Sequence, residues 1–340
     1  MMLTREKKYE AKDFKSAQVV RWCPGCGDFA VLSSLYKAMA ELGTPPHQTA
    51  VISGIGCSSR LPYYMNTYGF HTIHGRGAAI ATGVKLANPE LSVWLSTGDG
   101  DCLAIGGNHF IHAVRRNIDI NIILMNNKIY GLTKGQYSPT SDRGFVSKSS
   151  PFGTVEGPFS TAELTLGARG SFFARTIDVD IKNTVDVFVA ADKHKGTSVV
   201  EILLNCVIFN DGIYNKVIGK EWKAEKTIFL RHGEKMLFGK EQNKGIVLDG
   251  LSLKVAELDQ DEMAISRVLV HDATCKDSTL QTMLAKMDGE ELPMALGIIR
   301  QVEELTYDQE MQKTIAEEQK KNPTRRLQDF LMSGDIWEVK

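Results

Sequence analysis

Apolar and polar residues alternate most regularly within the first half of the chain, in blocks that match a strand, a tight turn, a helix and a second strand. An apolar run at 91–95 leads into a Gly-Asp-Gly turn, and a helical period follows over 103–116. A second apolar run, 118–125, stops at a pair of asparagines. This order predicts one βαβ unit of a parallel sheet. The ligand-binding loops of such a unit lie at the carboxyl ends of its strands.

The same periodicity predicts further strands and helices around this unit. The predicted helices cover 29–42, 161–167 and 181–194, and the predicted strands cover 50–52, 172–177 and 199–204. Strands that alternate with helices are typical of an α/β fold. We therefore expect a mostly parallel sheet with helices on both faces.

The C-terminal third has a different character. Residues 244–255 suggest a β-hairpin on an Asp-Gly turn, and the mixed charges of 303–321 are typical of a solvated helix. No catalytic set of side chains is recognisable after residue 210. We expect a cofactor-binding domain over 1–225 and a C-terminal extension over 226–340, which covers that domain or contacts another subunit.

Composition excludes some classes of function. With 40 basic and 41 acidic residues among 340, the formal net charge is −1, which argues against nucleic acid or a membrane surface as the main partner. No apolar run approaches the length of a membrane-spanning helix, and residues 1–15 lack the apolar core of a signal peptide. We expect a cytoplasmic protein whose six cysteines are metal ligands, reactive groups or core residues rather than disulfides.

The ends of the two strands in the βαβ unit suggest a metal–diphosphate site. Asp99 and Asn127 can supply oxygen ligands to Mg²⁺, which commonly shares its ligands with a substrate phosphate. Gly98 and Gly100 allow the backbone to approach a phosphate closely. Gly-Asp-Gly is also common in ordinary β-turns, but the asparagine pair that ends the next strand favours the metal site.

Four cysteines stand at the same predicted edge of the sheet. Cys23 and Cys26 form a Cys-x-x-Cys motif, while Cys57 and Cys206 each follow a predicted strand. A redox dithiol, a zinc site and an iron–sulfur site are all compatible with this spacing. The other two cysteines, at 102 and 275, have no partner at ligand spacing, and we expect both to be small buried side chains.

Four short motifs around these residues carry a resemblance to a known family. They are Trp22-Cys-Pro-Gly-Cys-Gly27, Gly54-Ile-Gly-Cys-Ser-Ser-Arg60, His71-Thr-Ile-His-Gly-Arg76 and Tyr130-Gly-Leu-Thr-Lys-Gly-Gln136. Together with the Gly-Asp-Gly and Asn-Asn signature, they resemble the β subunit of 2-oxoacid:ferredoxin oxidoreductases, and within it the 2-oxoglutarate branch. The resemblance runs from about 22 to 210 and returns weakly at 296–306.

The resemblance implies the thiamine-diphosphate-binding fold and a set of cofactor contacts. Asp99, Asn127 and the main-chain carbonyl of Ile129 would hold Mg²⁺ against thiamine diphosphate. The cofactor itself would contact Ile55, Gly56, Cys57, Ser58, His74, Gly98, Gly100, Asp101, Gly131 and Leu132. A lone histidine is more often structural than functional, so the composition alone gives His74 no role.

The resemblance also favours a [4Fe–4S] cluster, with Cys23, Cys26, Cys57 and Cys206 as its ligands. Many family members have proline after the last of these cysteines, where this chain has valine. Arg60 and Lys134 would bind the carboxylates of the 2-oxoacid, although an arginine or lysine is more often a solvated surface group. A cluster beside the thiamine can accept, one at a time, the electrons that decarboxylation releases.

The implied reaction is the oxidative decarboxylation of 2-oxoglutarate to succinyl-coenzyme A with reduction of ferredoxin, or its CO₂-fixing reverse. No glutamate in these motifs is placed to activate the thiamine ring, so an α subunit is expected to supply one, in an (αβ)₂ assembly. Alternatives are a pyruvate or broad-range 2-oxoacid enzyme and a non-redox thiamine lyase. A zinc-stabilised, non-catalytic assembly subunit is an alternative of another class.

Overall fold

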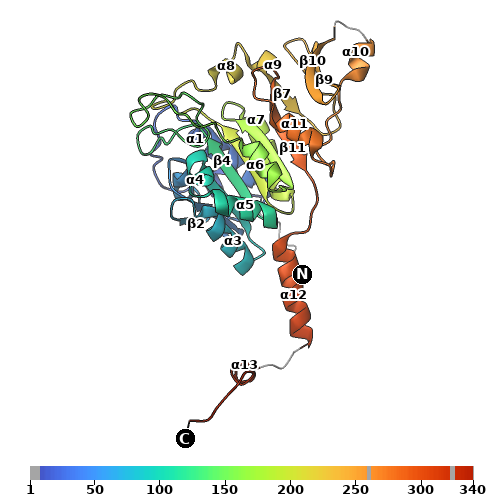
Figure 1. Cartoon of the computed structure of the whole chain (residues 1–340). Coiled ribbons are helices and arrows are strands. Elements are labelled where there is room, and N and C mark those ends of the chain that lie inside the picture. Colours follow the sequence, from blue (N-terminus) through green and yellow to red (C-terminus); the bar gives the residue numbers. More distant parts are fainter. Residues whose placement is uncertain (1–7, 259–261, 322–325, 340) are drawn as a thin grey trace.

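The structure is a computed structural model that describes residues 8–258, 262–321 and 326–339. Its centre is an eight-stranded sheet in the order β2-β1-β3-β4-β6-β5-β11-β7 (Figure 1). The strands are β1 Thr49–Ser53, β2 Tyr68–His71, β3 Ser92–Gly98, β4 Asn121–Asn126, β5 Phe172–Ile177, β6 Ser198–Leu203, β7 Thr227–Leu230 and β11 Met294–Gln301. β1 to β6 are parallel, whereas β11 runs antiparallel to β5 and parallel to β7. The predicted mostly parallel sheet is therefore confirmed.

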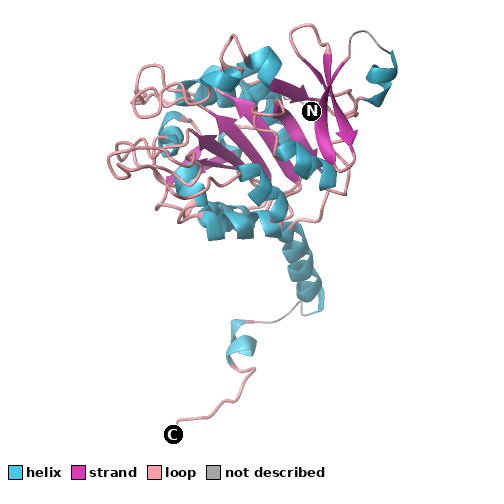
Figure 2. Ribbon diagram, turned by 45° about the horizontal axis from the view of Figure 1, so that its top comes forward, coloured by secondary structure: helices cyan, strands magenta, loops and turns pink. Residues whose placement is uncertain are grey.

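Helices cover both faces of this sheet (Figure 2). On one face α1 (Asp28–Leu42) packs against α7 (Ile181–Lys193). The other face carries α3 (Gly77–Ala87), α5 (Gly107–Arg116), α6 (Thr161–Gly167) and α11 (Thr279–Ala285). Shorter elements are η1 Ala11–Phe14, η2 Pro46–Gln48, η3 Ser58–Arg60, α2 Leu61–Tyr64, α4 Asp99–Leu103, α8 Asn215–Ile218, α9 Lys223–Lys226, α10 Glu262–Arg267 and α13 Leu327–Leu331. Within the described part of the chain, no helix combines the length and the apolar character needed to cross a membrane.

One predicted helix differs from the structure. The period over 103–116 predicted a single helix, but the chain forms α4 directly after β3 and then α5, with a break at 104–106. At the break Gly106 lies against Gly75 and the carbonyl oxygen of Asp101, where a Cβ atom would clash. The break lets the chain pass this crowded point. As a result, the short helix α4 is separate from α5 and forms part of the connection that follows β3.

The C-terminal extension takes part in the main sheet. β7 and β11 lie at one edge of it, while β8 (Leu237–Phe238), β9 (Lys244–Asp249) and β10 (Ser252–Glu257) form a separate three-stranded sheet. The predicted hairpin is confirmed by the antiparallel pairing of β9 with β10. The division at residue 225 stays a prediction. β7 and β11 lie beyond residue 225 but belong to the same sheet as β1 to β6. Residues 1–7 of the predicted first domain lie outside the described residues.

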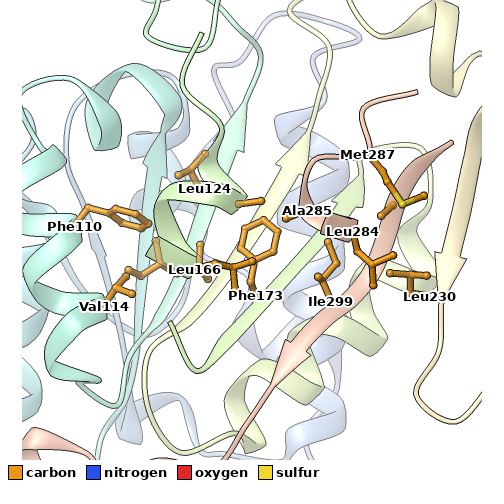
Figure 3. Close-up of a cluster of buried hydrophobic side chains, with 14 of the residues drawn as sticks. Phe110, Val114, Leu124, Leu166, Phe173, Leu230, Leu284, Ala285, Met287 and Ile299 are labelled. Atoms are coloured by element: carbon orange, nitrogen blue, oxygen red, sulfur yellow. The ribbon is translucent and has the colours of Figure 1, made fainter. Parts of the chain in front are cut away.

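Buried apolar side chains link the extension to the cofactor-binding part. Figure 3 shows Phe110 and Val114 of α5 beside Leu124 of β4, with Phe173 of β5 next to them. Ile299, Leu284 and Leu230 of the extension continue the same cluster. Burying one such side chain contributes about 1.5 to 3 kcal/mol, so this core stabilises both parts together.

The final described elements leave the body of the protein. α12 (Tyr307–Lys321) is the charged helix predicted over 303–321, and it projects away from the sheet (Figure 1). Its first turn is tied back where the Asp308 carboxylate accepts a hydrogen bond from the backbone N–H of Asp119 at 3.1 Å. Almost all of its other side chains are exposed, as expected of a solvated helix.

Candidate active site

A cavity of about 490 Å³ lies where β1, β3 and β4 reach their carboxyl ends. Every residue predicted to bind the magnesium ion or the thiamine lines it. These are Ile55, Gly56, Cys57, Ser58, His74, Gly98, Asp99, Gly100, Asp101, Asn127, Ile129, Gly131 and Leu132. The cavity is also lined by Asp28, Met125, Tyr130, Thr133 and Gln136, to which the sequence had assigned no role.

Asp99 begins α4 at the end of β3, and its side chain is buried in the cavity wall. Two hydroxyl groups donate hydrogen bonds to its Oδ2 atom, Ser138 at 2.5 Å and Thr140 at 2.6 Å. Burial raises the pKa of Asp99 to about 6, and the two hydroxyls partly oppose that rise. A cation in the cavity would favour the charged carboxylate and offset the cost of burying it.

The other two predicted magnesium ligands share one tight turn after β4. Lys128 adopts the left-handed region with φ at 54°, which bends the chain between Asn127 and Ile129. The Asn127 side-chain oxygen accepts a hydrogen bond from the backbone N–H of Ile129 at 3.2 Å. The Asn210 side chain donates to the Asn127 carbonyl at 2.9 Å and holds the turn from the opposite side.

A buried network of hydrogen bonds lies behind the predicted magnesium ligands, and the sequence did not predict it. Thr140 donates to the Asn126 side-chain oxygen at 2.9 Å as well as to Asp99. The Asn126 amide donates to Glu201 at 2.9 Å, and Glu201 pairs with Arg175 at 2.7 Å. Burial tends to raise the pKa of Glu201, but the Arg175 charge and hydrogen bonds outweigh it and lower that pKa. The network fixes both strand ends relative to each other.

Asp101 joins three segments of the cavity wall. Its Oδ1 atom lies 2.7 Å from the His74 Nδ1 atom and accepts hydrogen bonds from the backbone N–H groups of Ile55 at 3.0 Å and Gly75 at 2.7 Å. Its Oδ2 atom accepts from the Thr97 hydroxyl at 2.7 Å. The Asp101 side chain thus faces protein groups, whereas the predicted contact of its main chain with the diphosphate stays a prediction.

Two glycines leave room that a side chain would fill. A Cβ atom on Gly100 would clash with the Tyr130 ring, whose hydroxyl donates to the Gly100 carbonyl at 2.9 Å. Gly56 has φ at 127°, a conformation that L-residues rarely adopt. Both positions therefore need glycine to keep the backbone at the cavity surface.

The cysteine-bearing loops meet at the side of the same cavity. A Cβ atom built on Gly131 would lie 3.5 Å from the Cys206 sulfur and 3.8 Å from the Cys57 sulfur. The Trp22 indole N–H donates to the Cys57 carbonyl at 2.7 Å, and this bond ties the Cys-x-x-Cys segment to the turn after β1. Gly131 follows the predicted magnesium-binding turn by two residues, so the two predicted sites are neighbours.

Cys26, Cys57 and Cys206 are partly buried, whereas Cys23 is exposed. Burial raises the pKa of Cys57 to about 12, and negative charge on Asp28, Cys206 and Cys23 adds to the rise. Burial and Asp28 likewise raise the pKa of Cys26. Asp28 itself is buried, with pKa raised to about 7 by burial, and its Oδ2 atom has no hydrogen-bond partner among the described residues.

The four thiols are not arranged as a single-ion site. Across residues 8–258, 262–321 and 326–339, no group of three or more His, Cys, Asp or Glu side chains is placed to hold one metal ion. Of the remaining two cysteines, Cys102 is buried as predicted. The prediction that Cys275 is buried is wrong, because it lies in an exposed segment before α11.

Comparison with known proteins identifies the family of this chain. The chain is 46% identical over 339 residues to the 2-oxoglutarate oxidoreductase subunit KorB of Mycobacterium tuberculosis, covering 99% of this chain and 90% of that relative. This chain belongs to the β subunits of the 2-oxoacid:ferredoxin oxidoreductases. The β subunit of 2-oxoacid:ferredoxin oxidoreductase 1 from Aeropyrum pernix is 48% identical over 190 residues, 56% of this chain and 60% of that relative.

A solved structure and a domain family agree with membership of this β-subunit family. The 2-oxoglutarate:ferredoxin oxidoreductase from Magnetococcus marinus, solved with 2-oxoglutarate, coenzyme A and succinyl-CoA bound, matches with a TM-score of 0.75 and 30% identity over 96% of each chain. Residues 54–202 match the C-terminal TPP binding domain of thiamine pyrophosphate enzymes. The predicted α/β thiamine-diphosphate-binding fold is thereby confirmed.

The two cations predicted to bind substrate in this β subunit do not line the cavity. The Arg60 Nε atom donates to the Tyr64 hydroxyl at 3.0 Å, and its guanidinium lies 5.9 Å from the centre of the Tyr63 ring. Lys134 is exposed in the loop after the predicted magnesium-binding turn, with φ at 78°. Their roles toward the 2-oxoacid stay predictions.

Proposed function

We propose that this chain is the β subunit of a 2-oxoglutarate:ferredoxin oxidoreductase. The reaction is 2-oxoglutarate + coenzyme A + oxidised ferredoxin ⇌ succinyl-coenzyme A + CO₂ + reduced ferredoxin. Relatives named for 2-oxoglutarate support this substrate. The structural observation that carries the proposal is the position of Gly131. It lies beside two cysteine sulfurs and follows the predicted magnesium-binding turn.

The donors in the cavity fit a magnesium-bound diphosphate. Asp99 offers a buried carboxylate, Asn127 an amide oxygen and Ile129 a main-chain carbonyl, all oxygen ligands of the kind that Mg²⁺ prefers. Ser138 and Thr140 hold the Asp99 carboxylate by one oxygen, so its orientation is set before the ion binds. When bound, thiamine diphosphate supplies an electron sink for decarboxylation.

The cysteines fit an iron–sulfur cluster better than a zinc ion. Zinc binds each thiolate sulfur at ~2.3 Å, so its four ligands must converge closely. Cys57 and Cys206 lie near Gly131, and the described residues contain no such compact group. A four-iron cube spreads its ligand sulfurs more widely. Cys23, Cys26, Cys57 and Cys206 would hold the cluster, with Trp22 fixing the turn that carries Cys57.

Their raised pKa values mean that the thiols of Cys26 and Cys57 are protonated at neutral pH before the cluster binds. Ligation requires the thiolate, so cluster assembly releases protons from these residues. Assembly should therefore become more favourable as the pH rises.

The cavity needs a further chain to complete it. Among the described residues that line the cavity there is no glutamate, although thiamine enzymes use one to activate the cofactor. We infer that an α subunit contributes this glutamate and covers the cavity, with two αβ pairs related by a twofold axis. The loop after Thr140 exposes Phe152 and Val155 at 99% and 81%, apolar surface that a partner would bury.

The substrate carboxylates need cations near the cavity. Arg60 lies near Cys57, because its positive charge lowers the pKa of the Cys57 thiol and opposes the effect of burial. Lys134 is exposed and free to turn toward a ligand. We propose that both bind 2-oxoglutarate, and that ferredoxin collects electrons from the cluster.

The test is anaerobic purification of the chain together with its α subunit. The complex should contain iron in place of stoichiometric zinc and should reduce ferredoxin only with thiamine diphosphate, coenzyme A and a 2-oxoacid. A panel of 2-oxoglutarate, pyruvate and longer 2-oxoacids then identifies the substrate. A preference for pyruvate would mean that pyruvate, and not 2-oxoglutarate, is the substrate. A colourless zinc protein without turnover would refute the proposed oxidoreductase function.

Two variants separate the sites. Asp99→Ala should abolish binding of thiamine diphosphate while the iron content stays unchanged, because the carboxylate is not a cluster ligand. Cys206→Ser should lower the iron content, with Cys275→Ser as the matched control at an exposed cysteine. Loss of both cofactors in the Asp99 variant would contradict two separable sites.

A further inference from the structure

We propose that Asp101 is a positioning residue that aims the His74 ring into the cofactor cavity, so that the Nε2 atom of His74 contacts thiamine diphosphate. The inference rests on the proposed function, because it takes that cofactor as the ligand. Its new content is that the Asp101 carboxylate acts through a histidine rather than on the cofactor.

The geometry of the pair carries this inference. His74 lies in the turn between β2 and α3, and its ring lines the cavity. Its Nδ1 atom is 2.7 Å from the Asp101 Oδ1 atom, and Asp101 is buried. The His74 side chain nevertheless keeps 38% of its surface exposed, so the rest of the ring is open to a ligand.

The carboxylate also decides which ring nitrogen carries a hydrogen. A carboxylate oxygen is an acceptor, so the Nδ1 atom must be the donor in this contact. The partner of one ring nitrogen sets the state of the other. His74 is therefore held with Nδ1–H toward Asp101 and Nε2 toward the cavity.

Surrounding bonds hold Asp101 itself in place. Its two oxygens accept from the backbone N–H groups of Ile55 and Gly75 and from the Thr97 hydroxyl, at 2.7 to 3.0 Å. These donors belong to the turns after β1 and β2 and to β3. The ring of His74 also meets the Tyr130 ring edge-on, with centroids 6.2 Å apart, which restricts rotation from the cavity side.

The same bonds allow a simpler role, in which Asp101 only braces the two turns and His74 is incidental. Glutamine and asparagine at position 74 distinguish the two. The side-chain amide of glutamine reaches about as far as Nε2, and its oxygen can accept a hydrogen bond as Nε2 does, whereas the amide of asparagine reaches only the position of Nδ1. Glutamine can therefore contact a ligand in the cavity without Asp101 to orient a ring.

The experiment measures the Kd of thiamine diphosphate with Mg²⁺ on the αβ complex stripped of thiamine. Asp101→Asn and His74→Asn should each weaken binding tenfold or more, and His74→Gln should weaken it less than threefold. Asp101→Asn added to His74→Gln should then cost less than a further threefold. His47→Gln, at an exposed histidine, is the matched control and should bind as the unmodified complex does.

Each other outcome overturns the proposal. If Asp101→Asn weakens binding as strongly in the His74→Gln background as alone, Asp101 only braces the turns. Unchanged binding in His74→Asn removes the role of Nε2, and this variant can overturn the proposal even if the Asp101 variants fail to fold. The Kd is measured independently of turnover. Inactivity of the unmodified complex toward every 2-oxoacid would therefore contradict the proposed function and not this inference.

Discussion

Replacing Asp99 with asparagine should make the cofactor-free protein more stable while it abolishes cofactor binding. Asp99 is buried, and burial raises its pKa from the ordinary 3.8 to about 6. Without a metal ion, the folded protein must therefore hold a carboxylate that would be better solvated in the unfolded chain. Asparagine keeps the shape and an acceptor oxygen for Ser138 and Thr140 but carries no charge.

The magnitude follows from the two pKa values. Because the folded pKa lies above the unfolded one, the carboxyl costs no stability at low pH, and the cost grows as the pH rises from 3.8 to about 6. Each unit of difference corresponds to about 1.4 kcal/mol, so above pH 7 the cost reaches about 3 kcal/mol. At pH 5 roughly half of it remains.

Thermal unfolding of the cofactor-free αβ complex at pH 5 and pH 8 measures this effect. One kcal/mol shifts the Tm of a domain of 150–250 residues by about 2 to 4 °C, so a cost of about 3 kcal/mol means that Asp99→Asn should unfold roughly 6 to 12 °C higher at pH 8. Its advantage should shrink at pH 5. Addition of Mg²⁺ and thiamine diphosphate should raise the Tm of the unmodified complex only.

Asp101→Asn is the matched control, because Asp101 is an equally buried carboxylate that accepts four contacts from protein donors. That substitution should lower the Tm. The reasoning is refuted if Asp99→Asn lowers the Tm of the cofactor-free complex at pH 8, since this would mean that the Asp99 carboxylate is already stabilised by protein groups alone.

Three further changes test the surroundings of the site. Thr140→Val should weaken Mg²⁺-dependent cofactor binding ~10 to 100-fold, as loss of outer-shell partners commonly does, while Thr140→Ser retains it; equal affinities would exclude a role for the hydroxyl. Trp22→Phe, which loses the bond to Cys57 but keeps a ring, should lower iron content, and full iron occupancy would contradict that. Arg175→Met should destabilise the fold by about 3 to 5 kcal/mol by leaving Glu201 unpaired, and an unchanged Tm would show that the network is not needed.

Much of this protein was readable from local sequence. The strands of the βαβ unit, the helices at α1, α6 and α7, and the β9–β10 hairpin each follow from patterns of apolar residues and turns that span fewer than twenty positions. The residues predicted to bind magnesium and thiamine also gather around one cavity. They do so because parallel strands place their carboxyl ends, and the motifs that follow them, at one edge of the sheet.

Tertiary structure alone decided how these residues are supported. Thr140 meets Asp99 across 41 positions, Glu201 meets Asn126 across 75, and no local period records either contact. The same holds for β11, which lies beside β5, and for β7, which lies beside β11, because their places depend on the core that they share. Sequence determined which groups could do the chemistry because motifs are local, whereas the partners that orient them come from distant segments that only folding brings together.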